Sequence, residues 1–428
     1  MKTDKKLQNS WAFYDWANSV YPLVITTAIF PIFYEGYVDD NVTFFGFQFI
    51  NTALVTILSA AYFLLLVVTL PILTGIADSS GNKKAFMRFF CYMGSSCCVL
   101  LSLFNKTHLE WSFLIFVLAG IGFWSSLVFY NSFLPEIARE EDRDRLSAKG
   151  FSFGYIGSVI LLLVCLTIIF TSDEADRSFY TRLCFVLTGL WWFGFSHITF
   201  KQLPDGEKIS FGDKSTYSKG VEGLKKVWNQ VKKTKRLKRF IYAFFVYSMA
   251  VQTIMLVAVY FGTKEINWGE GDGAKVGLII SVLLIQLIAI PGALLLSKLS
   301  DKKGNIFALK ISIVVWIILC FSAFLVYEPT HFYFIAGFVG LVMGGIQSLS
   351  RSTYSKFIPD NTKDTSSFFS FYDIAEKLGI VIGMFSYGFI EQITGSMRNS
   401  IVALVIFFAG GLFLLYFVPK EEISFENE

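Results

Sequence analysis

The sequence is poor in charged residues. Only 16% of its 428 residues are Asp, Glu, Lys or Arg, whereas about 25% is usual for a soluble globular protein. Hydrophobic residues make up 54% of the chain and aromatic residues 18%. Water is therefore excluded as the main solvent, and we expect an integral membrane protein. The chain also lacks a long polar segment that would fold as a soluble enzyme or sensor domain.

Residues that bind metals or carry redox chemistry are scarce. The histidines stand at predicted helix ends, without the spacing of metal ligands, and the cysteines lie in apolar segments, where a thiol is usually a small buried hydrophobe. We therefore expect no metal site, no disulfide, no cofactor and no catalytic base among them. They are His108, His197 and His331, and Cys91, Cys97, Cys98, Cys165, Cys184 and Cys320.

Motifs of several other protein classes are missing. No GxxxxGK[ST] loop occurs, so ATP-driven transport would need another subunit. The net charge of +4 arises from basic residues in short loops between apolar runs, which argues against nucleic acid as a partner. The polar start MKTDKKLQNS is not followed by a short apolar core and a small-residue cleavage site, so we expect the first helix to remain in the mature protein.

Apolar segments recur along nearly the whole chain, and many reach the roughly 20 residues that a helix needs to cross a bilayer. The pattern predicts an all-α protein with twelve transmembrane helices. These spans lie near 14–36, 51–75, 86–104, 111–133, 151–171, 180–200, 240–262, 276–298, 306–326, 332–350, 367–390 and 399–418. Most Lys and Arg residues then fall on one side, which places both termini in the cytoplasm. We expect a monomer in the cell (inner) membrane, surrounded by lipid.

The longest loop, at about 201–239, separates six predicted spans from six and contains about a third of the Lys and Arg residues. We predict an N-terminal six-helix half at 1–200, a basic cytoplasmic linker at 201–239, and a C-terminal six-helix half at 240–428. The apolar residues of the linker favour a basic helix on the anionic inner leaflet. A solvated tether fits the same charge pattern. The apolar residues are Leu224, Val227, Val231 and Leu237.

Two motifs recur with nearly the same offset. The sequence DSSGNKK at 78–84 follows the second span, and DKKGN at 301–305 follows the eighth, 223 residues later. The sequence YNSFLPE at 130–136 follows the fourth span, and YSKFIPD at 354–360 follows the tenth, 224 residues later. A parallel duplication of six-helix units, with the substrate between them, is the plan of alternating-access transporters.

The first repeated motif stands where a helix leaves the membrane and turns back. Its glycines permit the positive φ of a tight turn, and its acids can accept hydrogen bonds or interact with a helix N-terminus across the interface between the halves. A turn that only follows the positive-inside rule is the alternative. The predicted gating residues are Asp78, Gly81, Lys83, Asp301 and Gly304.

The first span opens with the sequence WAFYDWANS at 11–19. An acid that enters the bilayer is costly unless it faces a cavity or a partner, so Asp15 is a candidate functional residue. Asn18 stands one turn further along and shares its face. Alternatively, Asp15 lies at headgroup level and anchors or caps the helix.

The eleventh predicted span contains three ionisable residues close together. Asp373 and Lys377 form an i, i+4 pair on one face, and Glu376 lies on an adjacent stripe. We interpret them as a substrate or proton site, and an ion pair that locks helices together is the alternative. Arg351, at the end of the tenth span, could pair with these acids or with an anionic substrate.

The fifth span begins with a face of small residues. Gly150, Gly154 and Gly157 permit close approach of another helix, as in the small-xxx-small pattern. We interpret this face as a packing surface. Tyr155, next to Gly154, is a candidate to point into a cavity.

Together, these segments resemble the vacuole-effluxer-like branch of the major facilitator superfamily. The resemblance is carried by FYDWANS at 13–19, ADSSGNKK at 77–84, FYNSFLPEIA at 129–138, SAKGFSFGYIGS at 147–158 and FFSFYDIAEKLG at 368–379. It implies the twelve-helix major facilitator fold and efflux or exchange of small solutes, and fungal vacuolar members of the branch are associated with amino-acid release.

The resulting hypothesis is a secondary active transporter, not an enzyme, that moves amino acids or a related small metabolite by alternating access. A proton or another ion is the expected coupling partner. Export of other small molecules, such as peptides, sugars or organic cations, and a non-transporting membrane receptor are the alternatives.

Overall fold

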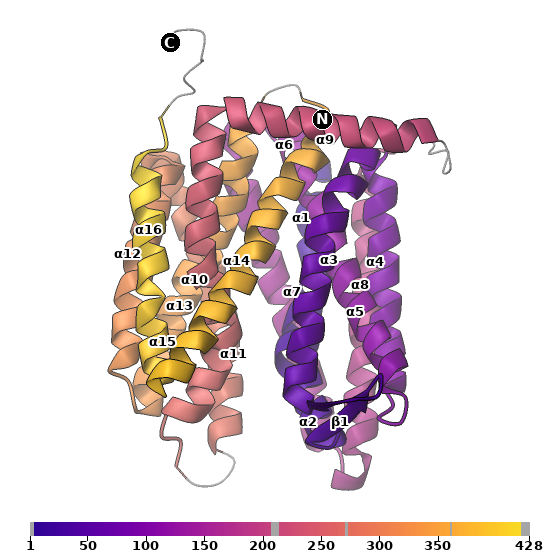
Figure 1. Ribbon diagram of the computed structural model, residues 1–428, viewed down its shortest axis with the longest axis vertical. Coiled ribbons are helices and arrows are strands. Elements are labelled where there is room, and N and C mark those ends of the chain that lie inside the picture. The colour runs from indigo at the N-terminus through magenta and orange to yellow at the C-terminus, as the bar shows by residue number, and fades with distance from the viewer. Residues whose placement is uncertain (1–3, 207–213, 270–272, 360–361, 421–428) are drawn as a thin grey trace.

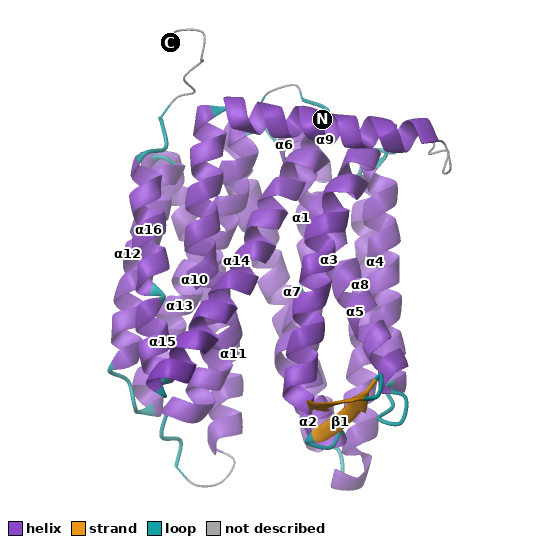
Figure 2. Cartoon of the chain, in the orientation of Figure 1, coloured by secondary structure: helices purple, strands orange, loops and turns teal. Residues whose placement is uncertain are grey.

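A computed structural model describes residues 4–206, 214–269, 273–359 and 362–420. Helices make up most of these residues, and two short strands form a hairpin at one end of the molecule (Figure 2). The all-α fold class is confirmed.

The first group of helices runs from residue 5 to residue 202. Its long members are α1 (Lys5–Asn18), α3 (Asn51–Ser80), α4 (Lys83–Leu100), α5 (Leu109–Ser132), α7 (Arg143–Thr171) and α8 (Arg177–Gln202). Shorter segments are the π-helical η1 (Tyr21–Ile29), α2 (Phe30–Tyr37), α6 (Leu134–Ile137), and single turns at η2 (Leu101–Leu103), η3 (Glu140–Asp142) and η4 (Glu174–Asp176). The hairpin joins β1 (Asn41–Phe44) to β2 (Phe47–Ile50) in antiparallel register. We call the helices of this range the N-terminal group.

The second group begins after a connecting helix, α9 (Lys214–Lys233). Its members are α10 (Lys235–Glu265), α11 (Gly273–Lys303), α12 (Asn305–Phe324), α13 (Pro329–Phe357), α14 (Thr365–Thr394), α15 (Met397–Ala403) and α16 (Val405–Tyr416). We call them the C-terminal group. In Figure 1 the two groups stand side by side, and α9 crosses one end of the bundle.

The two ends of the bundle differ. The start of α1 and the end of α16 lie at the same end as α9, whereas the hairpin lies at the opposite end (Figure 1). We refer to the first as the α9 end and to the second as the hairpin end.

Eleven helical stretches in the described residues are long and apolar enough to cross a membrane. They match every predicted span except 367–390, which coincides with α14. This helix has 30 residues, but Asp373, Glu376 and Lys377 interrupt its apolar sequence. The count of twelve spans therefore stays a prediction.

The surface of the bundle carries bulky apolar side chains. Phe385 is 73% exposed, Ile406 72% and Trp111 69%. Lipid tails are as apolar as these side chains, so helix association in a membrane depends on close packing. The contact between α11 and α13 illustrates this, because a Cβ atom at Gly340 would lie 2.4 Å from the carbonyl oxygen of Ile285.

The first helix begins earlier than predicted. It starts at Lys5 rather than near residue 14, because the Asp4 carboxylate accepts hydrogen bonds from the backbone amides of Lys6 and Leu7, at 2.9 and 3.1 Å. An acid at this position satisfies amides that have no partner within the helix. The polar start of the chain thus joins the first span.

The connecting helix α9 packs part of its apolar face against the protein. Val227 and Val231 are buried, α9 packs against α3 and α14, and the Trp228 ring stacks on Phe371 with 5.3 Å between centroids. The predicted helix is present, and a solvated tether is wrong for these residues. The placement of this helix on the inner leaflet stays a prediction.

Candidate functional site

A cavity of about 230 Å³ lies between the two groups of helices. The N-terminal group contributes α1, η1, α5 and α7 to its wall, and the C-terminal group contributes α10, α11, α13 and α14. Five of the seven predicted substrate or proton candidates line it: Asp15, Asn18, Tyr155, Arg351 and Glu376. The other two, Asp373 and Lys377, are buried in α14 beside the wall.

Asp15 and Arg351 form a buried ion pair that joins α1 to α13. Arg351 Nη1 lies 3.2 Å from Asp15 Oδ2, and the side chains are 3% and 7% exposed. The Tyr130 hydroxyl donates to the same carboxylate oxygen at 2.8 Å. The structure thus places Asp15 beside a cationic partner and at the wall of the cavity. Arg351 pairs with this acid, and not with the acids of α14 that the sequence suggested.

The remaining donors of Arg351 bind groups on α5 and α7. Its Nε donates to the Ser147 hydroxyl and its Nη2 to the Ser147 carbonyl, both at 2.9 Å, and its Nη1 reaches Asn131 Oδ1 at 3.3 Å. Its guanidinium also lies 4.3 Å from the centre of the Phe151 ring. One arginine of the C-terminal group is therefore held almost entirely by the N-terminal group.

The glycines of α7 admit this pair and the α1 backbone. A Cβ atom at Gly150 would lie 2.5 Å from Asp15 Oδ2 and 3.1 Å from Arg351 Nη2. One at Gly157 would lie 2.8 Å from the Trp16 carbonyl oxygen. The small-residue face therefore has the packing role that its spacing predicted.

On α14, Lys377 binds both neighbouring acids. Its ammonium pairs with Asp373 and, at 3.0 Å, with Glu376 Oε2, and the lysine side chain is fully buried. The ammonium also lies 3.6 Å from the centre of the Trp124 ring on α5. Glu376 Oε1 accepts a further hydrogen bond from Gln252 Nε2 at 2.9 Å. The predicted ion pair is present, and Glu376 connects it to the cavity.

Sequence reasoning missed several residues of the cavity wall. One of them is Gln347 on α13. The Tyr155 side chain lines the cavity, as predicted, and its hydroxyl donates a hydrogen bond to Gln347 Oε1 at 3.0 Å. Gln252 and Asn131 also line the cavity. Each is a polar residue within a predicted span, and Asn131 also lies in the repeated motif at 130–136. Among the described residues, no group of three or more His, Cys, Asp or Glu side chains is arranged to hold a metal ion.

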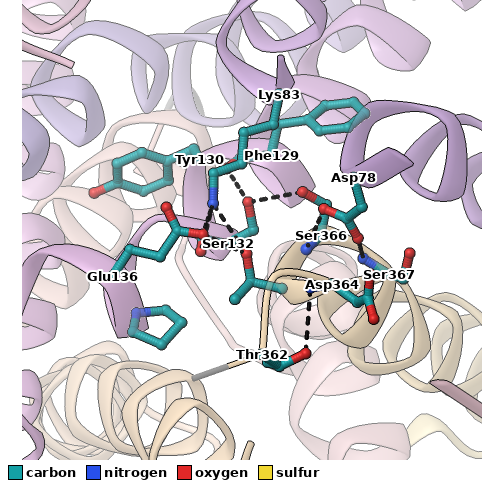
Figure 3. A network of polar contacts seen from close by, with 12 residues as sticks. Asp78, Lys83, Phe129, Tyr130, Ser132, Glu136, Thr362, Asp364, Ser366 and Ser367 are labelled. Carbon is teal, nitrogen blue, oxygen red and sulfur yellow. Dashed lines mark hydrogen bonds and ion pairs between the residues drawn. The ribbon is translucent and has the colours of Figure 1, made fainter. Parts of the chain in front are cut away.

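At the α9 end, Asp78 binds the first turn of α14 (Figure 3). Its carboxylate accepts hydrogen bonds from the backbone amides of Ser366, at 3.1 Å, and Ser367, at 2.6 Å. The amides of a first helical turn lack intrahelical acceptors and carry positive partial charge, so an acid stabilises them. Gly81 ends α3 with a φ of +64°. The contact across the interface is the one that the motif predicted.

Lys83 extends this contact into a network. Its ammonium pairs with Glu136 and donates to the Ser132 carbonyl at 3.2 Å and to the Thr365 hydroxyl at 2.9 Å. The Thr365 hydroxyl lies 2.9 Å from Glu136 Oε1. The second repeated motif, which contains Glu136, thus meets the first at the start of α14.

The corresponding turn in the C-terminal group is different. Gly304 has a φ of +86°, as a tight turn requires, but Asp301 lies 3.9 Å from the exposed Arg145 and binds no helix N-terminus among the described residues. A different acid, Asp144, is buried there. It accepts hydrogen bonds from Ser300 Oγ at 2.8 Å, and from Asn305 Nδ2 and Lys356 Nζ at 2.7 Å each.

The Lys84–Asp205 pair lies within the N-terminal group. Lys84 donates to the Leu203 carbonyl at 2.7 Å and to Asp205 Oδ1 at 2.6 Å. Asp205 stands outside the spans, and its hydrogen bond to the Lys84 ammonium lowers the pKa of its carboxyl. The pair ties the start of α4 to the residues that follow α8.

A comparison of the whole sequence with known families matches residues 3–426 to the model described as vacuole effluxer Atg22 like. The chain belongs to this family. Its resemblance to that branch of the major facilitator superfamily is thereby confirmed.

Similar proteins agree with this assignment. The chain is 30% identical over 426 residues to the uncharacterized MFS-type transporter YxiO of Bacillus subtilis, covering 98% of this chain and 96% of that protein. It is 26% identical over 302 residues to autophagy-related protein 22-1 of Penicillium rubens, covering 64% of this chain and 48% of the fungal protein. The chain therefore matches about half the length of this fungal relative.

The fold is that of a major facilitator. A crystal structure of the E. coli fucose:proton symporter FucP aligns with a TM-score of 0.66 and 17% identity, covering 97% of this chain and 98% of that one. Together with the family, this identifies a multi-pass membrane transporter for a small molecule.

Proposed function

We propose that this chain is a secondary active transporter for amino acids or closely related small metabolites, which works by alternating access and is coupled to protons. The observation that carries the proposal is the cavity between the two groups of helices, whose charged lining residues are Asp15, Arg351 and Glu376. Ionisable groups at membrane depth are costly and are typical of substrate and proton pathways.

The size of the cavity supports a small solute. Pockets for drug-sized ligands have volumes of about 300–1,000 Å³, and this cavity holds about 230 Å³. An amino acid suits such a space better than a large organic molecule. The fungal members that the sequence resembles favour the same class.

The hydrogen bonds between the two groups support alternating access. Asp78 and Asp144 each bind residues of the opposite group at the α9 end. We propose that these bonds close the α9 end, so that the cavity communicates with the hairpin end in this state. The basic loops support a cytoplasmic placement of the α9 end and of both chain termini, by the positive-inside rule, and the proposed six-plus-six division at 201–239 fits this arrangement.

The test is transport by purified protein in liposomes under an imposed pH gradient. Radiolabelled amino acids, a dipeptide, a sugar and an organic cation are compared in wild type and in the Asp373→Asn, Glu376→Gln double variant. We expect amino-acid flux that depends on the gradient in wild type and is strongly slowed in the variant. Equal rates and equal pH dependence in both proteins would contradict a role of the α14 acids in transport. Flux of only a sugar, a dipeptide or an organic cation would contradict amino acids as the substrate class.

A further inference from the structure

The charged groups around the cavity leave one negative charge without a partner of its own. Asp15 and Arg351 neutralise each other as a buried pair. On α14, two carboxylates share the single ammonium of Lys377. The two acids and one lysine of α14 therefore lack a second cation.

The unmatched charge faces the cavity at Glu376. Its side chain is 15% exposed, against 8% for Asp373 and 0% for Lys377, and of these three residues only Glu376 lines the cavity. Other titratable or charged groups at the cavity are Tyr372 and Asp373 on α14, Tyr247 on α10, Arg351 on α13, Tyr155 on α7, Tyr130 on α5 and Asp15 on α1. None of them adds a free cation.

Arg351 is not available to attract an anionic solute. Its guanidinium already donates to Asp15, Asn131 and the Ser147 hydroxyl and carbonyl. Binding of a carboxylate there would require these bonds to break, and would leave Asp15 buried without its counterion. The electrostatics of the cavity therefore oppose an anion and favour a cation.

The chain already contains an example of the required chemistry. The Lys377 ammonium is held by two carboxylates and by the face of Trp124, at 3.6 Å from the ring centre. Aromatic faces attract ammonium groups through the ring quadrupole. The wall of the cavity that Glu376 lines also includes the aromatic side chains of Tyr372, Tyr247 and Phe244.

A second observation points to a ligand. Asn18 lines the cavity and is 1% exposed, and its Nδ2 atom has no hydrogen-bond partner among the described residues. A buried donor without an acceptor is unfavourable. A solute with a carbonyl or another acceptor would satisfy it.

We propose that the ammonium group of a small amine and a proton compete for the Glu376 carboxylate, and that Asn18 donates a hydrogen bond to an acceptor on the same solute. The inference rests on the proposed function, since it takes the central cavity as the transport site. The cavity then selects amines that carry a hydrogen-bond acceptor and excludes anions. Exchange of one proton for one cationic solute follows from the single shared carboxylate.

Four derivatives of one molecule test the solute class. Leucinamide carries an ammonium and a carboxamide, leucine has a carboxylate in place of the carboxamide, N-acetylleucine is an anion, and N-acetylleucinamide is neutral. Binding to the purified protein is measured by thermal stabilisation as a function of concentration, because a ligand of the folded state raises the apparent stability. We expect leucinamide to bind at least as tightly as leucine. Binding of N-acetylleucine as tight as that of leucinamide would overturn the inference, as would the absence of any leucinamide binding.

The pH dependence tests the competition. At the acid end, the Kd of leucinamide should rise by about tenfold per pH unit, because one proton must leave for each amine bound. Glu376→Gln should abolish both the binding and this slope, whereas Glu376→Asp should retain the slope. Glu391→Gln, the same exchange on the same helix at a residue paired with Lys264, is the matched control and should behave as wild type. Unchanged binding and slope in Glu376→Gln would contradict the proposal.

Transport measured on the same samples separates this inference from the proposed function. Amine binding with the proton slope, but without flux in liposomes, would support the shared carboxylate and refute transport. Flux of a solute that is indifferent to Glu376→Gln would support transport and refute the shared carboxylate.

Discussion

On one side of the α9 end, Asp78 accepts hydrogen bonds from two backbone amides of α14, whereas on the other side Asp144 accepts them from three side chains. Both acids join the N-terminal group to the C-terminal group. The first uses donors that any residue except proline supplies. The second depends on Ser300, Asn305 and Lys356 being present together. The two groups of helices are thus joined at this end by contacts of different chemistry.

The repeated motif alone does not reveal this difference. Asp301 is the counterpart of Asp78 in the repeat, but it lies 3.9 Å from an arginine that is 74% exposed. The neighbouring Asn305, in the same motif, instead binds Asp144 on the opposite group. Both turns keep a glycine with positive φ, but its ψ is 16° at Gly81 and 154° at Gly304, and the acid of the second turn has a different environment.

The largest effect is expected when Asp144 is replaced. Asp144→Ala should weaken the closed α9 end by about 3–5 kcal/mol, because it leaves the Lys356 ammonium without its anionic partner. Distances between spin labels at the α9 ends of α3 and α14, and of α7 and α11, would report the opening. Asp142→Ala, which removes an acid two residues away, is the control. Wild-type label distances and wild-type stability in Asp144→Ala would contradict the role of Asp144 in joining the two groups of helices.

A smaller effect is expected at Asp78. Asp78→Asn keeps an oxygen that can accept one of the two amide hydrogen bonds but removes the charge, and should cost about 1–3 kcal/mol. The same labels should show opening mainly between α3 and α14. If Asp78→Asn opened the end more than Asp144→Ala does, the ranking of backbone and side-chain contacts would be wrong.

Asp301 should matter less than either. Its pair with Arg145 is exposed, and such pairs contribute about 0–1 kcal/mol. Asp301→Ala should therefore leave label distances and melting temperature close to wild type. A loss as large as that of Asp78→Asn would show that Asp301 gates the molecule in another state, as the repeated motif predicts.

The smallest effect is expected for a pair within one group. Since the pKa of Asp205 is lowered in the folded protein, its stabilising contribution is present above the ordinary Asp pKa of about 3.9 and is lost as the pH falls through the folded value. Asp205→Asn should melt slightly below wild type near neutral pH, and the two curves should converge in acid. Label distances should not change, because the pair does not join the two groups.

Much of the fold could be predicted because the relevant signal is local. The length and composition of each apolar run identify a membrane helix, and the glycines of the two turns predict their positive φ values. Asp15 and Glu376 could be proposed as site residues because an acid in an apolar membrane helix is energetically costly and usually has a function. Asp144 could not, since an acid at the start of a helix is common and needs no special partner.

The sequence by itself determined which segments enter the membrane, where the chain repeats and which helices carry ionisable residues, because hydrophobicity and spacing act over a few turns. Only the tertiary structure decided how those residues are paired. Arg351 meets Asp15 across 336 positions of the chain, and α9 buries Val227 and Val231 against the protein. Such contacts depend on how the two groups of helices pack against each other, and that packing is a property of the whole chain.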